Sequence, residues 1–437
     1  MATATTADTA PSFEVTHREV LRIAIPMMIA HFSTPLVSLV ATGVIGQLGE
    51  EALIGGVALA AVIFDVLFVT FNFLRGATTG FTAQAYGAGD RRFEQRMLLG
   101  GLTISMIAGL VILLLHVPIG NLGLTVLGAD GAVAEAAKVY FSWRVWSAPF
   151  VLFNFVAFGW IIGRGDALTA MLLQGLLNGL NLGLSIWWVL GLNGGVAGLA
   201  IASLVSEIVT ALAGAAIILC RTDKASWNWP DLKSLRRLFS VNGDMMIRSF
   251  ALLIGLSFFT RQSGELGIDI LAANTILLRF YFFGVAFLDG IATAAEQLAG
   301  RAVGARNRMI KLTTLWALVF GALVALSFMA GGWWVIDLAS PNATVERLAE
   351  GFLPYAAIMP LVGAIAFQMD GVYIGATWSR EMRNLMLLSL ATYFAAWAVL
   401  QPLFGNHGLW IALLLFQSAR SIAFRMMLPK LTARTLG

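Results

Sequence analysis

The chain has 437 residues, of which 59% are hydrophobic and only 12% are charged, and its mean hydropathy is +0.82. Soluble proteins carry about a quarter charged residues, so this composition excludes a soluble globular domain and predicts a membrane protein. The net charge of +4 is not gathered on one basic face, and we expect no nucleic-acid partner.

Twelve apolar stretches follow a polar N-terminal tail over residues 1–16, which lacks the basic and apolar regions of a signal peptide. Each stretch is long enough to cross a lipid bilayer as a helix. In chain order they cover residues 19–46, 52–75, 97–119, 136–162, 168–191, 196–220, 242–262, 269–297, 311–337, 349–376, 383–404 and 407–429.

An even number of spans places both termini on one side of the membrane, and the basic residues indicate which side. Loops, tails and span ends on that side hold 20 of the 28 basic residues, whereas only Lys138, Arg261 and Arg347 fall on the opposite side. Because cytoplasmic loops are enriched in lysine and arginine, both termini are predicted to be cytoplasmic. We expect a multi-pass protein of the bacterial inner membrane, surrounded by lipid.

The chain repeats itself once, with an offset of about 210–217 residues. The segment 73–76 (FLRG) returns as 287–290 (FLDG), 84–88 (QAYGA) returns as 301–305 (RAVGA), and Gly163 returns as Gly375. Six spans per copy give the copies the same orientation, which is typical of carriers that rock one half against the other. The predicted fold is an all-α membrane protein, with twelve transmembrane helices in two pseudo-symmetric six-helix lobes related by a parallel repeat. The N-lobe covers 17–220, a cytoplasmic linker 221–240, and the C-lobe 241–437.

Several motifs point to a known family. They are 39–49 (LVATGVIGQLG), 73–80 (FLRGATTG), 83–88 (AQAYGA), 288–290 (LDG), 370–371 (DG), 374–377 (IGAT) and 381–384 (EMRN). Together they resemble the multidrug and toxic compound extrusion (MATE) family, in its DinF-like branch, over residues 17–430. The resemblance implies export driven by an inward gradient of H⁺ or Na⁺. It also implies small organic substrates that are often cationic and amphipathic.

Two acids of the family pattern are missing from this chain. The family ends its first span with Val-Asp-Thr, where this chain has Ala41 between Val40 and Thr42. The family acid of the fifth span falls on Ser185, four residues after Asn181. Both are carboxylates that the family uses for ion coupling in the N-lobe, so coupling is expected to depend on other residues or to be lost.

Five acids and five arginines lie inside predicted spans, where an unpaired charge is costly. They are Asp65, Glu207, Asp289, Glu296 and Asp370, with Arg75, Arg144, Arg248, Arg279 and Arg420. With an offset of 214 residues, Asp65 corresponds to Arg279 and Arg75 to Asp289. We hypothesise two inter-lobe gating ion pairs, Asp65–Arg279 and Arg75–Asp289, which close the cytoplasmic side and weaken when the acid binds a proton. The alternative is that these groups find partners within their own lobes, at the membrane interface or in water.

The candidates for the ion-coupling site are Asp370, Asp289 and Glu296, with Asp65 included through its predicted ion pair. Asp370 has no basic residue within a helical turn, and an unpaired carboxyl group in an apolar helix suits a proton carrier. Glu296 follows Asp289 by seven residues, so both project from one helix face. The alternative for Glu296 is a structural pair with Arg301.

The candidates for the substrate cavity are Asn178, Asn181 and Ser185 of the fifth span and Arg248 of the seventh. The asparagines would alternatively join helices by hydrogen bonds. Arg248 is also expected to pair with Asp244, which precedes it by four residues.

Glu207, Arg420 and Arg144 are predicted to be structural. His31, in the middle of the first span, would be a proton relay or a buried core histidine.

Nothing in the sequence supports an enzyme. The chain has no HExxH motif, no nucleotide-binding loop and a single cysteine, Cys220, and we expect no metal site and no cofactor. The predicted function is a secondary active exporter: a monomeric rocker-switch antiporter of small molecules coupled to H⁺, with Na⁺ as the second choice. The alternatives are a flippase of lipid-linked precursors with the same broad fold, and a membrane scaffold, which the two-lobe repeat disfavours.

Overall fold

The structure is a computed structural model that describes residues 15–222, 227, 229–230, 232–301, 306–340 and 342–436. Within these residues every regular element is helical, and twelve helical segments are long and apolar enough to cross a membrane. The predicted all-α fold with twelve transmembrane helices is confirmed. Residues 1–14 of the predicted tail, 223–226, 228 and 231 of the predicted linker, and 302–305 of the repeat motif lie outside the described residues.

The N-lobe is built from nine α-helices, one 3₁₀ turn and one π-helical turn. Its elements are α1 (His17–Gly46), α2 (Glu51–Phe71), α3 (Phe73–Ala88), α4 (Arg91–Leu114), α5 (His116–Val126), α6 (Gly131–Arg144), η1 (Val145–Ser147), α7 (Ala148–Gly163), α8 (Ala167–Ile186), η2 (Trp187–Gly191) and α9 (Gly195–Arg221).

The C-lobe consists of six long helices in the described residues. They are α10 (Leu232–Glu265), α11 (Ile268–Arg301), α12 (Arg306–Ala339), α13 (Ala343–Gly375), α14 (Ser379–Phe404) and α15 (Asn406–Leu436). Helix α10 begins inside the 221–240 segment that the sequence predicts as a linker.

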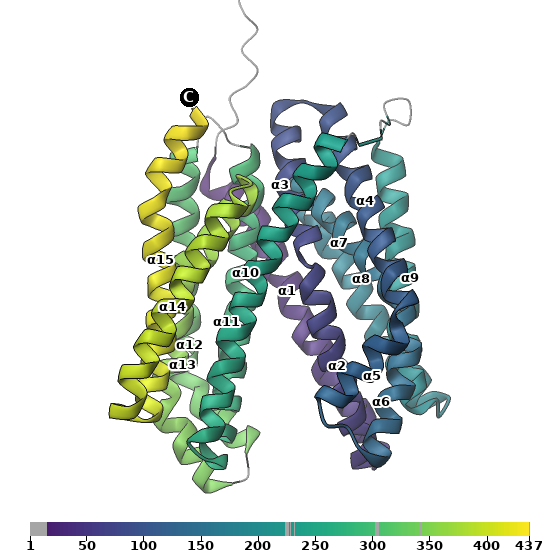
Figure 1. The fold of residues 1–437 in the computed structure, drawn as a ribbon, viewed down its shortest axis with the longest axis vertical. Coiled ribbons are helices and arrows are strands. Elements are labelled where there is room, and N and C mark those ends of the chain that lie inside the picture. Colours follow the sequence, from purple (N-terminus) through teal and green to yellow (C-terminus); the bar gives the residue numbers. More distant parts are fainter. Residues whose placement is uncertain are drawn as a thin grey trace, which may run out of the picture.

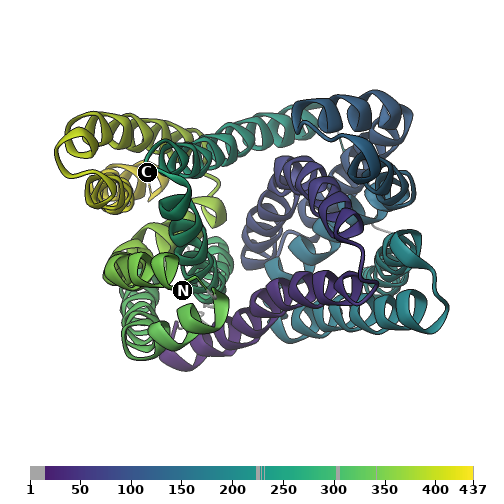
Figure 2. The same ribbon diagram turned by 90° about the horizontal axis from the view of Figure 1, so that it is seen from below.

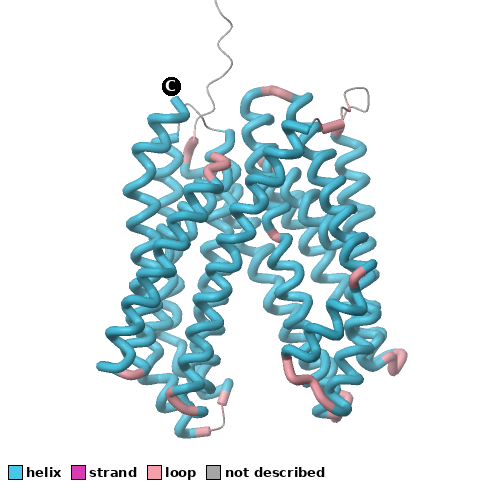
Figure 3. The backbone as a smooth tube through the Cα atoms, viewed as in Figure 1, coloured by secondary structure: helices cyan, strands magenta, loops and turns pink. Residues whose placement is uncertain are grey.

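Side-chain caps fix the starts of several helices. The side chains of Thr16, Asp90, Asp166 and Asn342 each accept a hydrogen bond from a backbone N–H in the first turn of α1, α4, α8 and α13. Such caps satisfy N–H groups that have no partner within the helix. Most loops lie at the two ends of the helices (Figure 3), as expected where lipid surrounds the middle of the molecule.

The second and third spans end at other residues than predicted. The second was predicted to end at residue 75, but the chain turns only slightly at Asn72 and continues as α3 to Ala88. The third was predicted to end at residue 119, but α4 ends at Leu114 and the short helix α5 follows. The break at Asn72 lies next to Arg75, one of the charged residues inside a span.

The two lobes lie side by side and diverge from one end of the molecule (Figure 1). We call the end where they touch, near the C-terminus, the closed end, and the opposite end the open end. The first helix of each repeat crosses to the other lobe: α1 packs on α11 and α12, and α10 packs on α3 and α4. Figure 2 shows α1 (purple) and α10 (teal) along opposite edges, as the pseudo-symmetric repeat requires.

The same glycine spacing holds the central helix pair of each lobe. In the N-lobe, Gly159 and Gly163 of α7 face α3; a Cβ on Gly163 would lie 2.6 Å from the Thr82 Cβ and 2.8 Å from the Thr79 carbonyl oxygen. In the C-lobe, Gly371 and Gly375 of α13 face α11 and would overlap its backbone. Glycines four apart allow membrane helices to approach closely.

Candidate transport site

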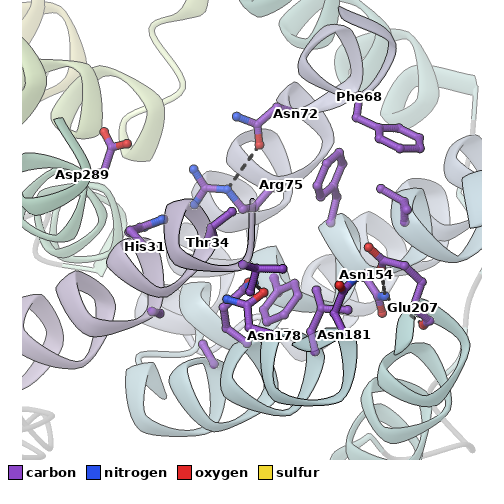
Figure 4. Close-up of a pocket in the computed structure, with 18 of the residues that line it drawn as sticks. His31, Thr34, Phe68, Asn72, Arg75, Asn154, Asn178, Asn181, Glu207 and Asp289 are labelled. Atoms are coloured by element: carbon purple, nitrogen blue, oxygen red, sulfur yellow. Dashed lines mark hydrogen bonds between the residues drawn. The ribbon is translucent and has the colours of Figure 1, made fainter. Parts of the chain in front are cut away.

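A polar cavity of about 420 Å³ occupies the N-lobe. Its walls come from α1, α2, α3, α6, α7, α8 and α9, with one residue, Asp289, from α11 of the other lobe. Figure 4 shows Asn154, Asn178, Asn181 and Glu207 on one side of it and Arg75, His31 and Asp289 on the other.

The asparagines of α8 line this cavity and also join helices. Asn178 donates to the Ser33 hydroxyl of α1 at 2.5 Å, and Asn181 donates to the Ser203 hydroxyl of α9 at 3.0 Å. Ser185 is buried, donates to Asn181 at 3.4 Å and does not line the cavity. The position at which the resemblance implied an acid is therefore a packed hydroxyl group.

Two other acids line the N-lobe cavity, together with the arginines Arg75 and Arg144. Asp65 of α2 and Glu207 of α9 both line it, and the charge of Arg144 acts on both. The Glu207 carboxylate accepts a 2.8 Å hydrogen bond from the Asn154 side chain. Arg144 lies over the ring of Phe64, 5.9 Å from its centroid.

Arg75 and Asp289 form the seam between the lobes. Both line the N-lobe cavity and a second cavity of about 450 Å³ in the C-lobe. Arg75 donates to Asn72 at 3.5 Å and acts on Asp289 through its charge, but no ion pair within 4.0 Å joins the two side chains. His31 of α1 also lies at the seam, with its Nε2 3.3 Å from the Thr293 hydroxyl of α11.

Glu296 lies deeper in the C-lobe cavity on the same face of α11 as Asp289. Its side chain is buried, and its Oε1 atom has no hydrogen-bond partner in the part of the chain that the structure describes. Thr79, from α3 of the other lobe, lies near this carboxylate, and its hydroxyl donates to the Arg75 carbonyl at 2.9 Å.

Asp370 is not the unpaired carboxylate that its sequence surroundings predict. Its Oδ2 atom accepts hydrogen bonds from Arg248 of α10 and, at 2.6 Å, from Arg420 of α15. Arg420 is fully buried and also donates to Gln417 at 2.6 Å, and Gln417 donates to the Tyr281 hydroxyl at 2.9 Å. The prediction was wrong because both arginines come from other helices, 122 and 50 residues away in the sequence.

The expected local pair of Asp244 with Arg248 is also wrong. Asp244 accepts instead from Arg383 at 2.5 Å and from Ser379 at 3.1 Å, both on α14. Arg248 is thereby free to reach Asp370, and it lines the C-lobe cavity rather than the N-lobe cavity.

The structure does not bring Asp65 and Arg279 together. Asp65 lines the N-lobe cavity, whereas Arg279 lines a separate apolar pocket between α1, α11 and α12. Asp65 belongs to α2 and Arg279 to α11, and no ion pair within 4.0 Å joins the two side chains. The predicted pair is therefore not formed in this arrangement of the lobes.

Other contacts join the lobes at the closed end. The Gln84 side chain of α3 donates to the Gly375 carbonyl at 2.9 Å and to the Thr377 hydroxyl at 3.3 Å. Arg301 of α11 lies 5.1 Å from the Tyr86 ring centroid, and Arg164 of the N-lobe lies 5.6 Å from it. Each such cation–π contact contributes about 0.5–1 kcal/mol at an exposed site.

These contacts follow the repeat. Gln84 and Arg301 occupy equivalent positions, and each reaches the helix end of the opposite lobe: Thr377 after α13 and Gly165 after α7. Thr377 and Gly165 have φ values of +57° and +83°. This left-handed conformation suits glycine but is strained for a β-branched threonine.

Sequence reasoning missed Asn154 and treated Glu207 and Arg144 as structural, although all three line the N-lobe cavity. Their only signal in the sequence is a polar side chain in an apolar span. Which face of the helix carries that side chain, and what faces it, is decided by packing.

A duplicated twelve-helix bundle with a polar cavity in each lobe is the architecture of a membrane transporter. The MatE family model matches residues 26–187 and 245–401 of this chain. The DNA damage-inducible protein F of Escherichia coli is 35% identical over 412 residues, which span 92% of this chain and 89% of that protein. The chain belongs to the MATE family of multidrug efflux transporters.

More distant relatives agree with this assignment. The probable multidrug resistance protein NorM of Deinococcus radiodurans is 27% identical and matches over 91% of each chain. The multidrug export protein MepA of Staphylococcus aureus is 21% identical over 93% of this chain and 92% of that protein. Both proteins are named for multidrug resistance or export, and membership of this family makes the chain a transporter rather than an enzyme.

Solved structures share the fold. An outward-facing multidrug resistance MATE family transporter of the MOP superfamily superposes with a TM-score of 0.88 at 21% identity, over 96% of both chains. A MOP superfamily transporter from Pyrococcus furiosus, described as having a binding pocket of reverse polarity, gives 0.87 at 21% identity, over 96% of this chain and 97% of that one.

Proposed function

We propose that this protein exports small amphipathic organic compounds from the cytoplasm in exchange for protons, and that Asp289 and Glu296 carry the protons. The observation that supports this most directly is the position of Asp289, which lines the cavities of both lobes. A group in that position can respond to whichever cavity is occupied.

Asp289 and Glu296 are the better candidates among the acids that the sequence singles out. Asp370 is held by two arginines, so we assign it a fixed role in holding α10, α13 and α15 together. Neither Asp289 nor Glu296 has an ion-pair partner within 4.0 Å among the described residues. Binding a proton removes a charge that is costly to keep away from water.

Protonation of Asp289 would act on the seam between the lobes. While Asp289 is charged, it attracts Arg75 of the other lobe, and neutralisation removes that attraction. We propose that this change favours separation of α3 from α11 and therefore opening of the closed end. Alternation of the lobes in this way is the rocker-switch mechanism that the parallel repeat predicts.

The N-lobe cavity suits organic cations. Three acids line it, Asp65, Glu207 and Asp289, against two arginines, Arg75 and Arg144. Asn178 and Asn181 supply hydrogen-bonding groups beside the apolar side chains of Phe68, Phe155 and Phe158. A pocket with apolar walls and a few polar groups is typical of small-molecule sites.

A proton fits the seam better than a sodium ion. Sodium is held by several oxygen atoms gathered in one place, whereas the acids at the seam lie close to the positive charges of Arg75 and Arg248. Those charges would repel a metal cation, and a protonated carboxyl group avoids that repulsion.

The orientation follows from charge. The closed end carries basic residues of the predicted cytoplasmic loops, such as Arg91, Arg164 and Arg221, so we propose that it faces the cytoplasm. The open end then faces outward in this structure. Each lobe has its own cavity, so we propose that a monomer in the bacterial inner membrane is the transporting unit.

The experiment uses purified protein in liposomes with a fluorescent cationic dye and an imposed pH gradient. We expect Asp289→Asn to abolish gradient-driven dye movement while leaving dye-for-dye exchange in place, because exchange needs no change in protonation. Asp337→Asn, an exposed acid on α12, is the matched control and should behave as wild type. Gradient-driven transport that survives in both Asp289→Asn and Glu296→Gln would refute the assignment of these acids as proton carriers. Transport that depends on a sodium gradient would show that Na⁺, and not H⁺, is the coupling ion.

A further inference from the structure

Arg279 lies in an unusual position for a charged residue of a membrane span. It lines a pocket of about 570 Å³ whose other walls are almost entirely apolar, formed by α11, α12 and one ring of α1. The aromatic side chains of this pocket are Phe32, Phe280, Phe283, Phe287, Phe328 and Trp334. Arg279 is eleven residues from the start of α11, or roughly 16 Å along the helix, well inside the depth that lipid covers.

Among the described residues, no protein group neutralises this guanidinium. None of the described residues that line the pocket is acidic, and no carboxylate in the described part of the chain lies within 4.0 Å of Arg279. The other polar side chain of the pocket, Ser327, donates its hydroxyl hydrogen to the Leu323 carbonyl of its own helix. An arginine at this depth normally pairs with an acid or reaches water, because its charge is costly in hydrocarbon.

The pocket is separate from both transport cavities. Consecutive residues of α11 divide between them: Phe282 lines the C-lobe cavity and Phe283 lines this pocket. Phe32 of α1 contacts Phe283 and Phe287 with ring centroids 5.7 and 5.2 Å away. Trp334 on α12 is 59% exposed on the surface that the membrane would cover, so the pocket opens toward lipid.

We propose that this pocket binds single-chain amphipathic anions, with the anionic head on Arg279 and the hydrocarbon tail among the rings of α11 and α12. The positive charge at the rim selects the head, and the aromatic walls select the tail. The volume lies within the range of about 300–1,000 Å³ that holds one small organic ligand. Asp65, at the equivalent position of the other repeat, lines a polar cavity instead, so the two lobes would take ligands of opposite charge.

The test is equilibrium binding of a dansylated fatty acid to the full chain in phosphatidylcholine nanodiscs, with empty discs as background. We expect dodecyl sulfate to displace the probe and dodecyltrimethylammonium, with the same tail and the opposite charge, to fail. Arg279→Gln should weaken binding about tenfold or more, as expected for the loss of a charge-assisted hydrogen bond. Arg279→Glu should abolish binding of the anionic probe, because the pocket would then repel its head.

A second variant tests whether the hydrocarbon tail of the ligand occupies the apolar pocket. A Cβ on Gly331 meets nothing within 4 Å, so Gly331→Leu should fit without strain and occupy the pocket, excluding the probe. The matched controls are Arg347→Gln and Gly351→Leu, both on α13 and outside the pocket, which should bind as wild type.

The proposal would be overturned if Arg279→Gln bound the probe with unchanged affinity, or if both detergents displaced the probe equally well. It would also be overturned if anionic phospholipid added to the disc abolished probe binding, because bulk lipid would then be the occupant of the pocket. Because binding is measured without an ion gradient, failure here leaves the proposed export function standing. Conversely, Asp289→Asn should keep full probe binding.

Discussion

At the scale of single residues, the charges inside the membrane divide into fixed and exchangeable groups. Asp370 is fixed because two arginines donate to one of its oxygens, and Arg420 is completely buried. Within the described part of the chain, Asp289 and Glu296 have no arginine within 4.0 Å. This difference, rather than the presence of an acid in an apolar helix, separates a structural carboxylate from a candidate proton carrier.

Replacing Asp370 tests this division. In Asp370→Asn, Arg248 and Arg420 keep their charges without the carboxylate, and breaking a buried ion pair in this way costs about 3–5 kcal/mol. We therefore expect a large drop in the melting temperature of the purified protein in detergent. Asp244→Asn, which breaks the more exposed pair with Arg383, should cost less, since the Arg383 side chain is 26% exposed.

A double variant completes the comparison. Adding Arg420→Gln to Asp370→Asn removes one unpaired charge and should restore part of the lost stability. If Asp370→Asn melts like wild type and loses only the pH dependence of transport, Asp370 is the proton carrier, as its sequence surroundings suggested.

At the scale of helices, the repeat is visible in how α7 packs on α3 and α13 packs on α11. In each pair, two glycines four residues apart bring one backbone against the other. The contact is tight enough that a single methyl group has no room. These pairs form the rigid centre of each lobe, and they position Arg75 on α3 and Asp289 on α11.

Gly163→Ala is expected to destabilise the N-lobe by about 1–3 kcal/mol, the usual cost of overpacking. The added Cβ would meet Thr82 and the Thr79 carbonyl at 2.6 and 2.8 Å. The matched control is Gly179→Ala on α8, where nothing lies within 4 Å of the new Cβ. Alanine is the better helix former, so Gly179→Ala should melt at or above the wild-type temperature. Equal melting temperatures for the two variants would contradict the packing account.

At the scale of the whole molecule, polar contacts at the closed end join the two lobes, and transport requires these contacts to be temporary. Gln84, Tyr86 and Arg301 contribute a few hydrogen bonds and ring contacts. Contacts of this kind are weak enough to break in each cycle. The strained backbone at Thr377 is consistent with a junction that is released when the lobes move.

Cross-linking the lobes should stop transport. With Cys220 changed to serine, Tyr86→Cys and Arg301→Cys bridged by a short cleavable thiol reagent should arrest dye export, and cleavage of the bridge should restore it. The matched control bridges Tyr86→Cys to Arg164→Cys, a similarly close pair within the N-lobe. Export that continues across the inter-lobe bridge would exclude the rocker-switch mechanism.

The sequence by itself determined the membrane class, the number of spans and the duplicated six-helix plan. A bilayer requires a run of about 20 apolar residues for each crossing, and each run is a continuous segment of the sequence that can be recognised without knowing the tertiary structure. The sequence also correctly placed Asp289 and Glu296 on one face of a helix, because this follows from their spacing of seven residues alone.

Only the tertiary structure decided which charges meet. Asp370 pairs with Arg248 and Arg420, and Asp244 pairs with Arg383. Arg279 lines an apolar pocket and does not pair with Asp65. Each outcome depends on how a helix is rotated about its axis and on which helix lies beside it. Those are set by packing between segments far apart in the chain, which hydropathy and spacing do not record.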